Sequence, residues 1–232
     1  MHNQIQISTT DGTFLAYVAR PSVTPAPVIV VIHEVFGVNA DMRQSCDDLA
    51  AQGYMAICPD LFWRTEPDVD LTDQTEAERA KGLALYIAFD LDAGVADIAA
   101  TVEAARAMPD STGKVGLVGY CLGGLMTYLT TARVGADVAV AYYPGNADRH
   151  LEEAGRIASP LIVHLAEEDE YIPKAAQQQI VAALKDRPQV QVYGYPGCKH
   201  AFARHRGISY DAAAAALANG RTDAFLAQHL KR

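Results

Sequence analysis

The chain has 232 residues, of which half are hydrophobic and a fifth are charged, and its formal net charge at pH 7 is −9. This length and composition are typical of one globular domain with a sizeable core, so we expect a single domain over residues 1–232. Nucleic acid and anionic membrane surfaces attract clustered Lys and Arg, and this acidic chain shows no such cluster. We therefore expect neither as a partner.

Targeting signals and cofactor motifs are not expected in this chain. The N-terminal stretch Met1–Ile5 has neither a basic start followed by an apolar run nor a cleavage site. No stretch reaches the roughly eighteen apolar residues of a membrane-spanning helix. The four cysteines, at positions 46, 58, 121 and 198, lie far apart without a Cys-x-x-Cys pair, which favours free thiols over zinc ligands or a disulfide framework. These features predict a cytoplasmic protein without a metal or organic cofactor.

The predicted strands begin with an antiparallel pair and continue as buried runs. Residues 5–8 and 14–19 are β-rich and are joined by an Asp-Gly turn, which is typical of a hairpin at a sheet edge. Residues 28–32 (VIVVI) show no alternation, as expected of a strand buried on both faces of a mostly parallel sheet. Further strands are predicted at 54–58, from 115 to a turn at 119, and at 137–143, 161–166 and 190–195.

Helices are predicted between most of these strands. Asn39 can cap the first helix, and a polar, acidic loop at residues 65–73 precedes the next. The remaining helices are predicted at 74–86, at 92–108, from about Leu122, between the later strands, and at about 209–229. This alternation predicts βαβ units with right-handed crossovers, and hence an α/β three-layer sandwich with a mostly parallel central sheet.

The stretch VGLVGYCLGG, residues 115–124, predicts an apolar strand that enters a sharp turn and then a helix. A reactive side chain at the tip of such a turn needs small neighbours, and Gly119 and Gly123 meet that need. This pattern is typical of a nucleophile elbow, with Cys121 where most hydrolases carry Ser. The sequence therefore predicts a thiol as the attacking group, whereas the other three cysteines are interpreted as structural.

Three more reactive side chains follow predicted strands, namely Glu34, Asp169 and His200. Ligands of open α/β sheets bind at the carboxyl ends of the strands. The chain order of nucleophile, acid and histidine is the order found in α/β-hydrolases. We therefore predict Cys121 as the nucleophile, His200 as the base and Asp169 as the group that orients the base.

Backbone N–H groups are the predicted donors for the oxyanion that such a reaction forms. The candidates are the N–H of Leu122, at the start of the elbow helix, and the N–H of Val35, beside the end of the first buried strand. A helix N-terminus carries unpaired N–H groups and a partial positive charge, which favour an oxyanion and a thiolate.

Each candidate also has a plain structural interpretation. Asp169 lies in an acidic run that could be a solvated surface, and Glu34 could be an ordinary surface carboxylate. His33, His150, His164 and His205 compete with His200 as the base, but chain order favours His200, and we interpret His33 and His164 as braces for neighbouring loops. Cys198 lies near His200 and could face the site, although we interpret it as part of a loop.

Four stretches together resemble the dienelactone hydrolase (carboxymethylenebutenolidase) family of the α/β-hydrolase superfamily. They are residues 33–37 (HEVFG), 119–124 (GYCLGG), 164–173 and 200–204 (HAFAR). The resemblance covers essentially the whole chain, and the cysteine elbow together with the glutamate stretch is far more specific than either alone. It implies a hydrolase that opens an enol-lactone such as dienelactone through an acyl-enzyme on cysteine.

The resemblance also implies roles for three further residues. In the family, the glutamate that matches Glu34 holds the resting thiol neutral and deprotonates it when substrate displaces the carboxylate from an arginine. Two arginines that bind a substrate carboxylate in the family match Arg79 and Arg204. The alternative is that neither binds substrate: Arg79 could simply pair with Glu76 or Glu78, and Arg204 could simply form a surface ion pair. We expect a carboxylate-bearing lactone or ester as substrate, bound by a monomer.

Some residues favour other functions. Ala201 stands where the family has Ser after the catalytic histidine, and Leu83 and Tyr86 could reshape the pocket. These differences favour a related ester or lactone hydrolase with a less anionic substrate as the alternative. A third hypothesis is a binding or redox-responsive module that uses Cys121 as a sensor thiol, but it would leave the other site residues idle.

Overall fold

The computed structural model describes residues 3–231. Met1 and His2, the first two residues of the N-terminal stretch discussed above, lie outside the described residues. An eight-stranded sheet has the order β1-β2-β4-β3-β5-β6-β7-β8, and parallel pairs include β3–β4, β6–β7 and β7–β8. Helices flank the strands, which confirms the predicted α/β class with a mostly parallel sheet. The chain divides into two compact units, one ending at Leu117 and one beginning at Val118. That both units form a single domain stays a prediction.

The N-terminal unit begins with the predicted antiparallel edge. Strands β1 (Gln4–Ser8) and β2 (Thr13–Ala19) form a hairpin, and β2 pairs antiparallel with β4 (Met55–Pro59). Strand β3 (Ala26–Ile32) pairs parallel with β4 and is buried at every position. Because neither face of β3 meets water, its sequence is apolar throughout rather than alternating.

Two helices of this unit pack on its strands. Helix α1 (Ala40–Ala51) begins after Asn39, whose side chain accepts the N–H of Met42 as predicted for an N-cap. Helix α3 (Leu91–Ala107) contacts β3 and β4, and α1 contacts the same two strands. These contacts bury β3 beneath helices.

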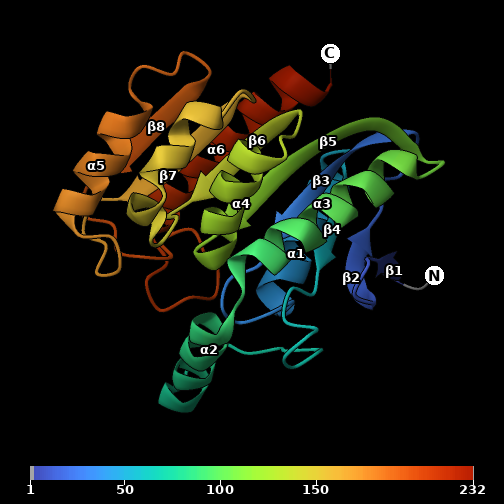
Figure 1. Ribbon diagram of the computed structural model, residues 1–232, viewed down its shortest axis with the longest axis horizontal. Helices are drawn as coiled ribbons and strands as arrows, with labels where there is room; N and C mark the ends of the chain where they lie inside the picture. Colours follow the sequence, from blue (N-terminus) through green and yellow to red (C-terminus); the bar gives the residue numbers. More distant parts are fainter. Residues whose placement is uncertain (1–2, 232) are drawn as a thin grey trace. The chain divides into compact units, whose positions relative to one another are not determined.

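Helix α2 (Glu76–Ala88) is held by its N-terminus rather than by a broad apolar face. Thr75 accepts the backbone N–H of Glu78, and its hydroxyl donates to the Glu78 carboxylate, which is a variant of the capping box. The side chains of Leu83 and Ile87 are 55% and 75% exposed. In Figure 1, α2 projects away from the strands of its own unit.

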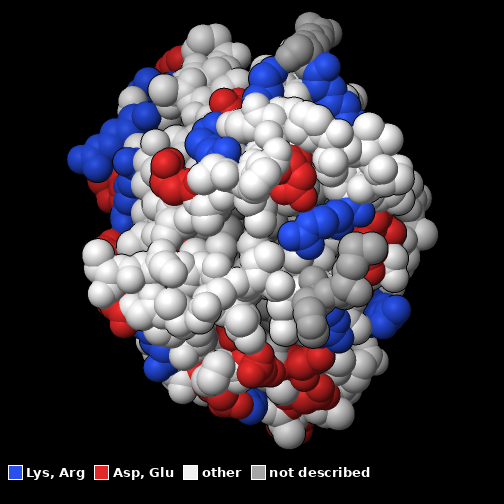
Figure 2. Space-filling model, turned by 90° about the vertical axis from the view of Figure 1, so that its right-hand side faces the viewer, with Lys and Arg blue, Asp and Glu red and all other residues white. Residues whose placement is uncertain are grey.

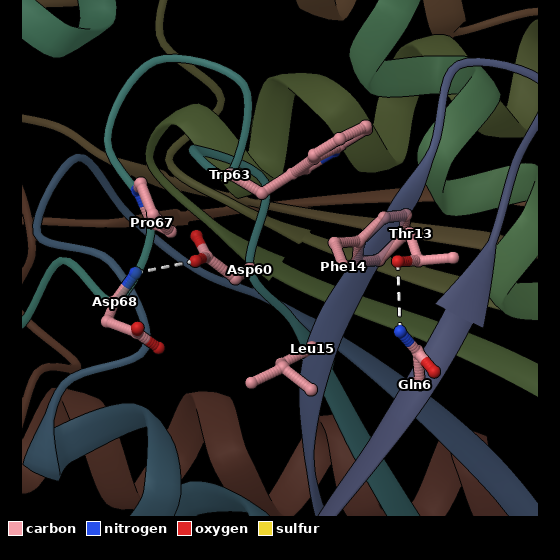
Figure 3. A pocket seen from close by; sticks show the side chains of 8 residues that line it. All are labelled: Gln6, Thr13, Phe14, Leu15, Asp60, Trp63, Pro67 and Asp68. Carbon is pink, nitrogen blue, oxygen red and sulfur yellow. Dashed lines mark hydrogen bonds between the residues drawn. The ribbon is translucent and has the colours of Figure 1, made fainter.

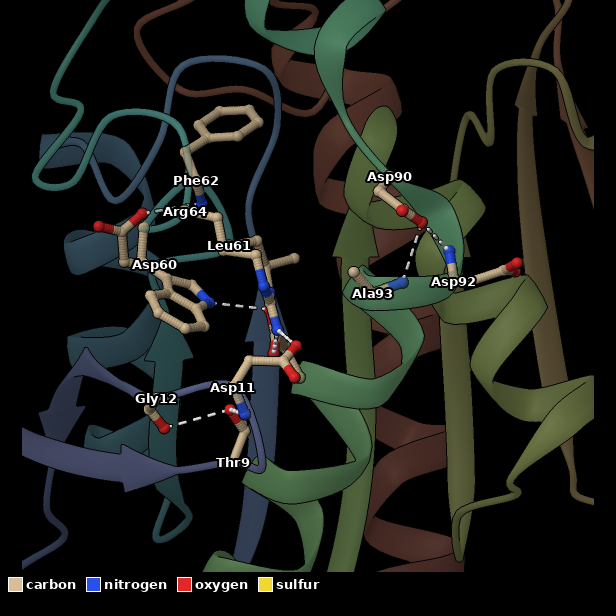
Figure 4. Close-up of polar contacts among 12 residues, drawn as sticks. Thr9, Asp11, Gly12, Asp60, Leu61, Phe62, Arg64, Asp90, Asp92 and Ala93 are labelled. Atoms are coloured by element: carbon tan, nitrogen blue, oxygen red, sulfur yellow. Dashed lines mark hydrogen bonds and ion pairs between the residues drawn. The ribbon is translucent and has the colours of Figure 1, made fainter.

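A buried carboxylate fastens the loop after β4 to α3. Asp97 is fully buried and accepts hydrogen bonds from Trp63 Nε1, at 2.9 Å, and from the Arg64 guanidinium. Arg64 also reaches the exposed Asp11 at 2.8 Å, a contact drawn in Figure 4. The loop that leaves β4 is therefore connected to both the β1–β2 turn and α3.

We expect Asp97→Asn to lower the free energy of unfolding by about 2–3 kcal/mol, because it leaves the Arg64 charge without its buried partner. Asp11→Asn removes the exposed partner of the same guanidinium and serves as the matched control, with an expected loss below about 1 kcal/mol. Urea unfolding of the two variants measures both values. Equal losses would contradict the assignment of Asp97 as the anchor.

The C-terminal unit contains the end of β5 (Ser111–Tyr120) and three further strands. Strands β6 (Val138–Tyr142), β7 (Leu161–Ala166) and β8 (Val190–Tyr195) lie next to one another, and β7 is parallel to both of its neighbours. Their helices are α4 (Leu122–Arg133), α5 (Lys174–Leu184) and α6 (Ala212–Leu230). Both α4 and α6 contact β6.

The β6–β7 connection differs from the expectation of a helix between the strands. It contains two short 3₁₀ helices, Ala147–Arg149 and Leu151–Arg156, instead of an α-helix. Pro144 and Gly145 lie near the start of the connection, and Asn146 takes a left-handed conformation with φ of 63°. These residues interrupt the helical backbone before a regular turn can continue.

His164 braces a helix and a strand rather than the neighbouring loops that the sequence interpretation expected. Its two ring nitrogens contact the hydroxyl oxygens of Thr222 on α6, at 3.0 Å, and Tyr195 on β8, at 2.7 Å. Burial, followed by the charge of Arg221, lowers the pKa of His164 to about 3. His164 is therefore a neutral link between α6 and the sheet.

Within residues 3–231, no helix combines the length and apolar character needed to cross a bilayer. Figure 2 shows Lys and Arg interspersed with Asp and Glu on the face that it draws, with acidic side chains gathered at the lower end. Basic side chains on this face are therefore dispersed among acidic ones.

Candidate active site

Cys121 lies between β5 and α4 in a backbone conformation that few side chains adopt. Its φ is 56° and its ψ is −113°, and its side chain is half-buried. The Cys121 N–H donates to Tyr142 O at 3.1 Å, and its carbonyl accepts the N–H of Leu125 at 3.0 Å. Such strain at the tip of a strand-to-helix turn is typical of a nucleophile elbow.

Two glycines allow this turn to close. A Cβ added to Gly119 would lie 2.0 Å from the carbonyl oxygen of Gly123, so no side chain fits there. A Cβ on Gly124 would lie 2.3 Å from Tyr142 O, the same oxygen that accepts the Cys121 N–H. The close approach at Gly119 agrees with the prediction that the elbow needs small residues beside Cys121. Gly124, which the prediction did not include, must also be a glycine.

Asp169 and His200 form a buried, hydrogen-bonded pair. His200 Nδ1 lies 2.8 Å from Asp169 Oδ2, and the two residues are 6% and 5% exposed. Asp169 Oδ1 accepts the backbone N–H groups of Tyr171 and Ile172, at 2.8 and 3.1 Å. The interpretation of Asp169 as part of a solvated acidic surface is therefore wrong.

The imidazole of His200 interacts with both Asp169 and Cys121. Burial by itself would lower the pKa of His200, but its interaction with Cys121 and its hydrogen bond to Asp169 raise that pKa to about 10. The structure thus brings the three predicted groups together within the C-terminal unit. Such a set can take a proton from a thiol and return it to a leaving group.

Two tyrosines beside His200 were not among the predicted site residues. The ring centroids of Tyr143 and Tyr171 lie 5.0 and 4.9 Å from that of His200. Tyr143 directly follows β6, and Tyr171 lies two residues after Asp169. The position of Tyr143 at the carboxyl end of a strand was a signal that could have found it.

Glu34 is buried, although it lies in the turn that follows a strand. Its exposed fraction is 2%, so the interpretation as an ordinary surface carboxylate is wrong. The preceding His33 contacts Glu34 O through Nδ1, at 2.6 Å, and accepts the N–H of Leu61 through Nε2, at 3.0 Å. His33 thus braces two loops, as expected, while Val35 continues the turn that leaves β3.

The two predicted substrate-binding arginines differ in burial. Arg79 is exposed on α2 and donates to Asp73 O at 2.6 Å. Glu78, one of its suggested ion-pair partners, instead accepts hydrogen bonds from Thr72. Arg204 is only 9% exposed, so the interpretation as a surface ion pair is wrong.

All four cysteines are free thiols, as predicted. Cys46 and Cys58 are completely buried in the N-terminal unit, and burial, followed by the Cys58 contact, raises the pKa of Cys46 well above its usual range. Cys198 is also buried, and its carbonyl accepts the N–H of Glu168 at 2.8 Å. These three thiols are structural, and Cys198 belongs to a loop as expected.

One group of residues has the composition of a metal site but is better explained as an ion pair. Among the residues that the structure describes, His150, Glu152 and Glu153 place potential ligand atoms within 4.8 Å of one another. Arg133 already binds both Glu153 oxygens, at 2.6 and 2.8 Å. Because this carboxylate is occupied by a bidentate arginine, we assign no metal to it.

A shallow pocket of about 230 Å³ opens in the N-terminal unit, between the β1–β2 hairpin and the loop after β4 (Figure 3). Asp60 at this pocket accepts the N–H of Asp68 at 2.8 Å. The pocket contains none of the predicted site residues. Its lining is Gln6, Thr13, Phe14, Leu15, Asp60, Trp63, Pro67 and Asp68.

The sheet with flanking helices, the strained cysteine after β5 and the histidine–aspartate pair together define a protein of the α/β-hydrolase fold. The sequence model of the "Dienelactone hydrolase family" matches residues 14–230, and the chain belongs to that family. Its members hydrolyse ester or lactone bonds, and the chain is accordingly a hydrolase of this class.

Curated relatives and solved structures agree with this membership. The chain is 43% identical to a carboxymethylenebutenolidase from Pseudomonas putida, over 96% of this chain and 95% of that protein. It is 44% identical to a putative carboxymethylenebutenolidase from Azospirillum brasilense, over 95% of each. The crystal structure of a putative dienelactone hydrolase from Klebsiella pneumoniae subsp. pneumoniae matches with a TM-score of 0.84 and 25% identity, over 97% of each chain.

Proposed function

We propose that the chain is a carboxymethylenebutenolidase that opens dienelactone through an acyl-enzyme on Cys121. The observation that carries this proposal is the strained Cys121 at the elbow, which interacts with His200 of the buried His200–Asp169 pair. The relatives named as carboxymethylenebutenolidases support the choice of substrate. Ring opening of cis- or trans-dienelactone by the purified protein tests it directly.

The reaction follows from the roles of these groups. His200 takes the proton of the Cys121 thiol, and the resulting thiolate attacks the lactone carbonyl carbon and forms a tetrahedral oxyanion. The N–H groups of Leu122 and Val35 bind this oxygen, and the ring C–O bond breaks as the carbonyl re-forms. His200 protonates the leaving oxygen, then takes a proton from water, which attacks the thioester and releases Cys121. Asp169 keeps the proton of His200 on Nδ1 throughout.

We further propose that Glu34 controls when the thiol ionises, as the family resemblance implies. A thiol that is kept neutral between turnovers is protected from oxidation and alkylation. The burial of the Glu34 carboxylate supports a role beyond surface charge. The raised pKa of His200 supports the competing possibility of a permanent thiolate–imidazolium pair.

Alkylation by iodoacetamide distinguishes these two resting states. We expect Cys121 to react at pH 7 at least about tenfold faster in the presence of an anionic substrate analogue than in its absence, because a neutral thiol is a poor nucleophile. Glu34→Gln, which keeps the shape of the side chain, is expected to remove this acceleration. Equal and fast alkylation with and without the analogue would contradict gating and favour the permanent ion pair.

We propose that Arg204, together with Arg79, binds the carboxylate of the substrate. The burial of Arg204 supports this role, since a buried guanidinium provides a strong, oriented site for an anion. We expect Arg204→Gln to raise KM for dienelactone by about 10²-fold and to leave hydrolysis of p-nitrophenyl acetate nearly unchanged. Arg206→Gln, on the same loop, is the matched control.

The alternative substrate class is an ester or lactone without a carboxylate. The exposed Leu83 on α2, the nearby Tyr86 and the small Ala201 after His200 favour this interpretation of the pocket. Comparable kcat/KM values on dienelactone and on uncharged esters, together with an unaltered KM in Arg204→Gln, would establish the alternative and contradict the anionic substrate.

A further inference from the structure

The two tyrosine rings that contact His200 differ sharply in exposure. Tyr143 is completely buried, whereas Tyr171 is 64% exposed, and the rings meet the imidazole at interplanar angles of 59° and 72°. The Tyr171 ring meets the imidazole edge-to-face, an arrangement that is favourable for aromatic rings at this distance, and the Tyr143 ring meets it at a tilt. We name Tyr143 and Tyr171 together the aromatic enclosure of His200.

Backbone strain marks Tyr143 as part of the site. Its φ is 36°, and its N–H donates to His164 O at 2.7 Å. The other non-glycine residues with positive φ among those described are Asp68, Cys121, Asn146 and Ala201. Asp and Asn adopt this region readily, but Cys, Tyr and Ala do not. The three unfavourable cases are thus the nucleophile, the residue after the base, and Tyr143, as expected when strain is retained for function.

Tyr143 is also tied to the nucleophile through its neighbour in the chain. Tyr142 O accepts the Cys121 N–H, and the next residue, Tyr143, places its ring against His200. The Tyr143 ring packs in turn against Phe202, with centroids 5.7 Å apart. The last residue of β6 and the residue that follows it therefore contact Cys121 and His200, respectively.

Tyr171 is exposed but its backbone is fixed. Its N–H donates to Asp169 Oδ1, and the following Ile172 donates to the same oxygen and is completely buried. The carboxylate that orients His200 thus also anchors the segment that carries the outer ring. Partial burial raises the pKa of Tyr171, and the charge of Cys121 contributes, which agrees with a phenol near the thiol.

We propose that Tyr143 and Tyr171 are positioning residues that hold the imidazole of His200 in line between Asp169 and Cys121. The hydrogen bond to Asp169 fixes one nitrogen but leaves the ring free to tilt, and a base displaced by about 1 Å loses much of its efficiency. Ring contacts limit this tilt. The proposal rests on the proposed function, because it assigns the enclosure to the base of that reaction.

The outer ring provides the sharper test, because an exposed ring contributes little to the folded core. We expect Tyr171→Ala to lower kcat for dienelactone about tenfold and to keep KM within about twofold, while Tyr171→Phe retains the wild-type kcat. A ring that only lines the substrate pocket would instead raise KM and leave kcat unchanged. Tyr210→Ala is the matched control, since Tyr210 also packs against a histidine, His205, with ring centroids 5.5 Å apart.

A spectroscopic readout follows the imidazole itself. The proton on Nδ1 of His200, held by Asp169, gives a downfield signal in proton NMR when its exchange with water is slow. We expect this signal to broaden in Tyr171→Ala and in Tyr143→Leu, and to persist in Tyr171→Phe and in the Tyr210→Ala control. Thermal unfolding verifies that each variant is folded before its spectrum is compared.

The outcomes separate this proposal from the function on which it rests. Unchanged kcat and an unchanged proton signal in Tyr171→Ala overturn the positioning role, even if Cys121 of the wild-type protein still forms an acyl adduct. A wild-type protein that hydrolyses no lactone or ester and forms no adduct overturns the proposed function. A lowered kcat with a broadened signal, rescued by phenylalanine, supports the aromatic enclosure.

Discussion

Replacing Cys121 with Ala is expected to lower kcat/KM for dienelactone by roughly 10⁴-fold or more, because the variant lacks the proposed nucleophile. The half-buried Cys121 lies at the elbow, beside an imidazole whose pKa its charge helps to raise. Steady-state ring opening, followed by ultraviolet absorbance, measures the effect. Cys121→Ala removes the sulfur and keeps both His200 and Asp169 in the chain, so it tests the identity of the nucleophile.

Cys198→Ala is the matched control for this experiment. Its thiol is also in the C-terminal unit, two residues from His200, but it is buried in a loop and has a raised pKa through burial. We expect this variant to keep the wild-type rate within about threefold. Equal activity of Cys121→Ala and wild type would refute the assignment of the nucleophile, whatever the control shows.

The second large effect is expected for Asp169→Asn, with a fall in kcat of about 10⁴-fold. The amide oxygen of the substituted side chain can still accept the N–H groups of Tyr171 and Ile172, so the loop keeps its anchor. The amide nitrogen would then face His200 Nδ1 and donate to it, which places the imidazole proton on Nε2. In that tautomer, His200 cannot take a proton from the thiol or from water.

Glu168→Gln controls for the loss of one negative charge in the same acidic run. The Glu168 side chain is 58% exposed and forms an ion pair with Lys174 at 3.2 Å. We expect its kcat to stay within about twofold of wild type, because exposed charges near a site are screened by water. A comparable fall in both variants would show that net charge, rather than the His200 hydrogen bond, is responsible.

Local sequence patterns located most of the fold. The run VIVVI identified the doubly buried β3, and Asn39 identified the start of α1, because strand burial and capping are properties of neighbouring residues. The β6–β7 connection was misjudged, since the Pro144-Gly145 pair and the left-handed Asn146 prevented a regular helix. The predicted alternation of strands and helices does not show which connection lacks a regular α-helix.

Residues of the candidate site could be predicted where a reactive side chain also occupies the expected position in the chain order. Cys121 and His200 follow from the elbow and from the order of reactive residues, but Asp169 could not be separated from its acidic neighbours by periodicity. Only its burial and its backbone hydrogen bonds distinguish it. Tyr143 was missed because its contact with His200 joins residues far apart in the chain, which no local pattern records.

The central claim is that Cys121 carries the acyl group during turnover, and mass spectrometry of the trapped enzyme tests it most directly. The protein is mixed with a slowly hydrolysed lactone, quenched in acid within the first turnovers and digested. We predict that the peptide containing Cys121 gains the mass of the ring-opened acyl group, while the peptide containing Cys198 stays unmodified. An unmodified Cys121 during active turnover, or an acyl group on another residue, would contradict the account.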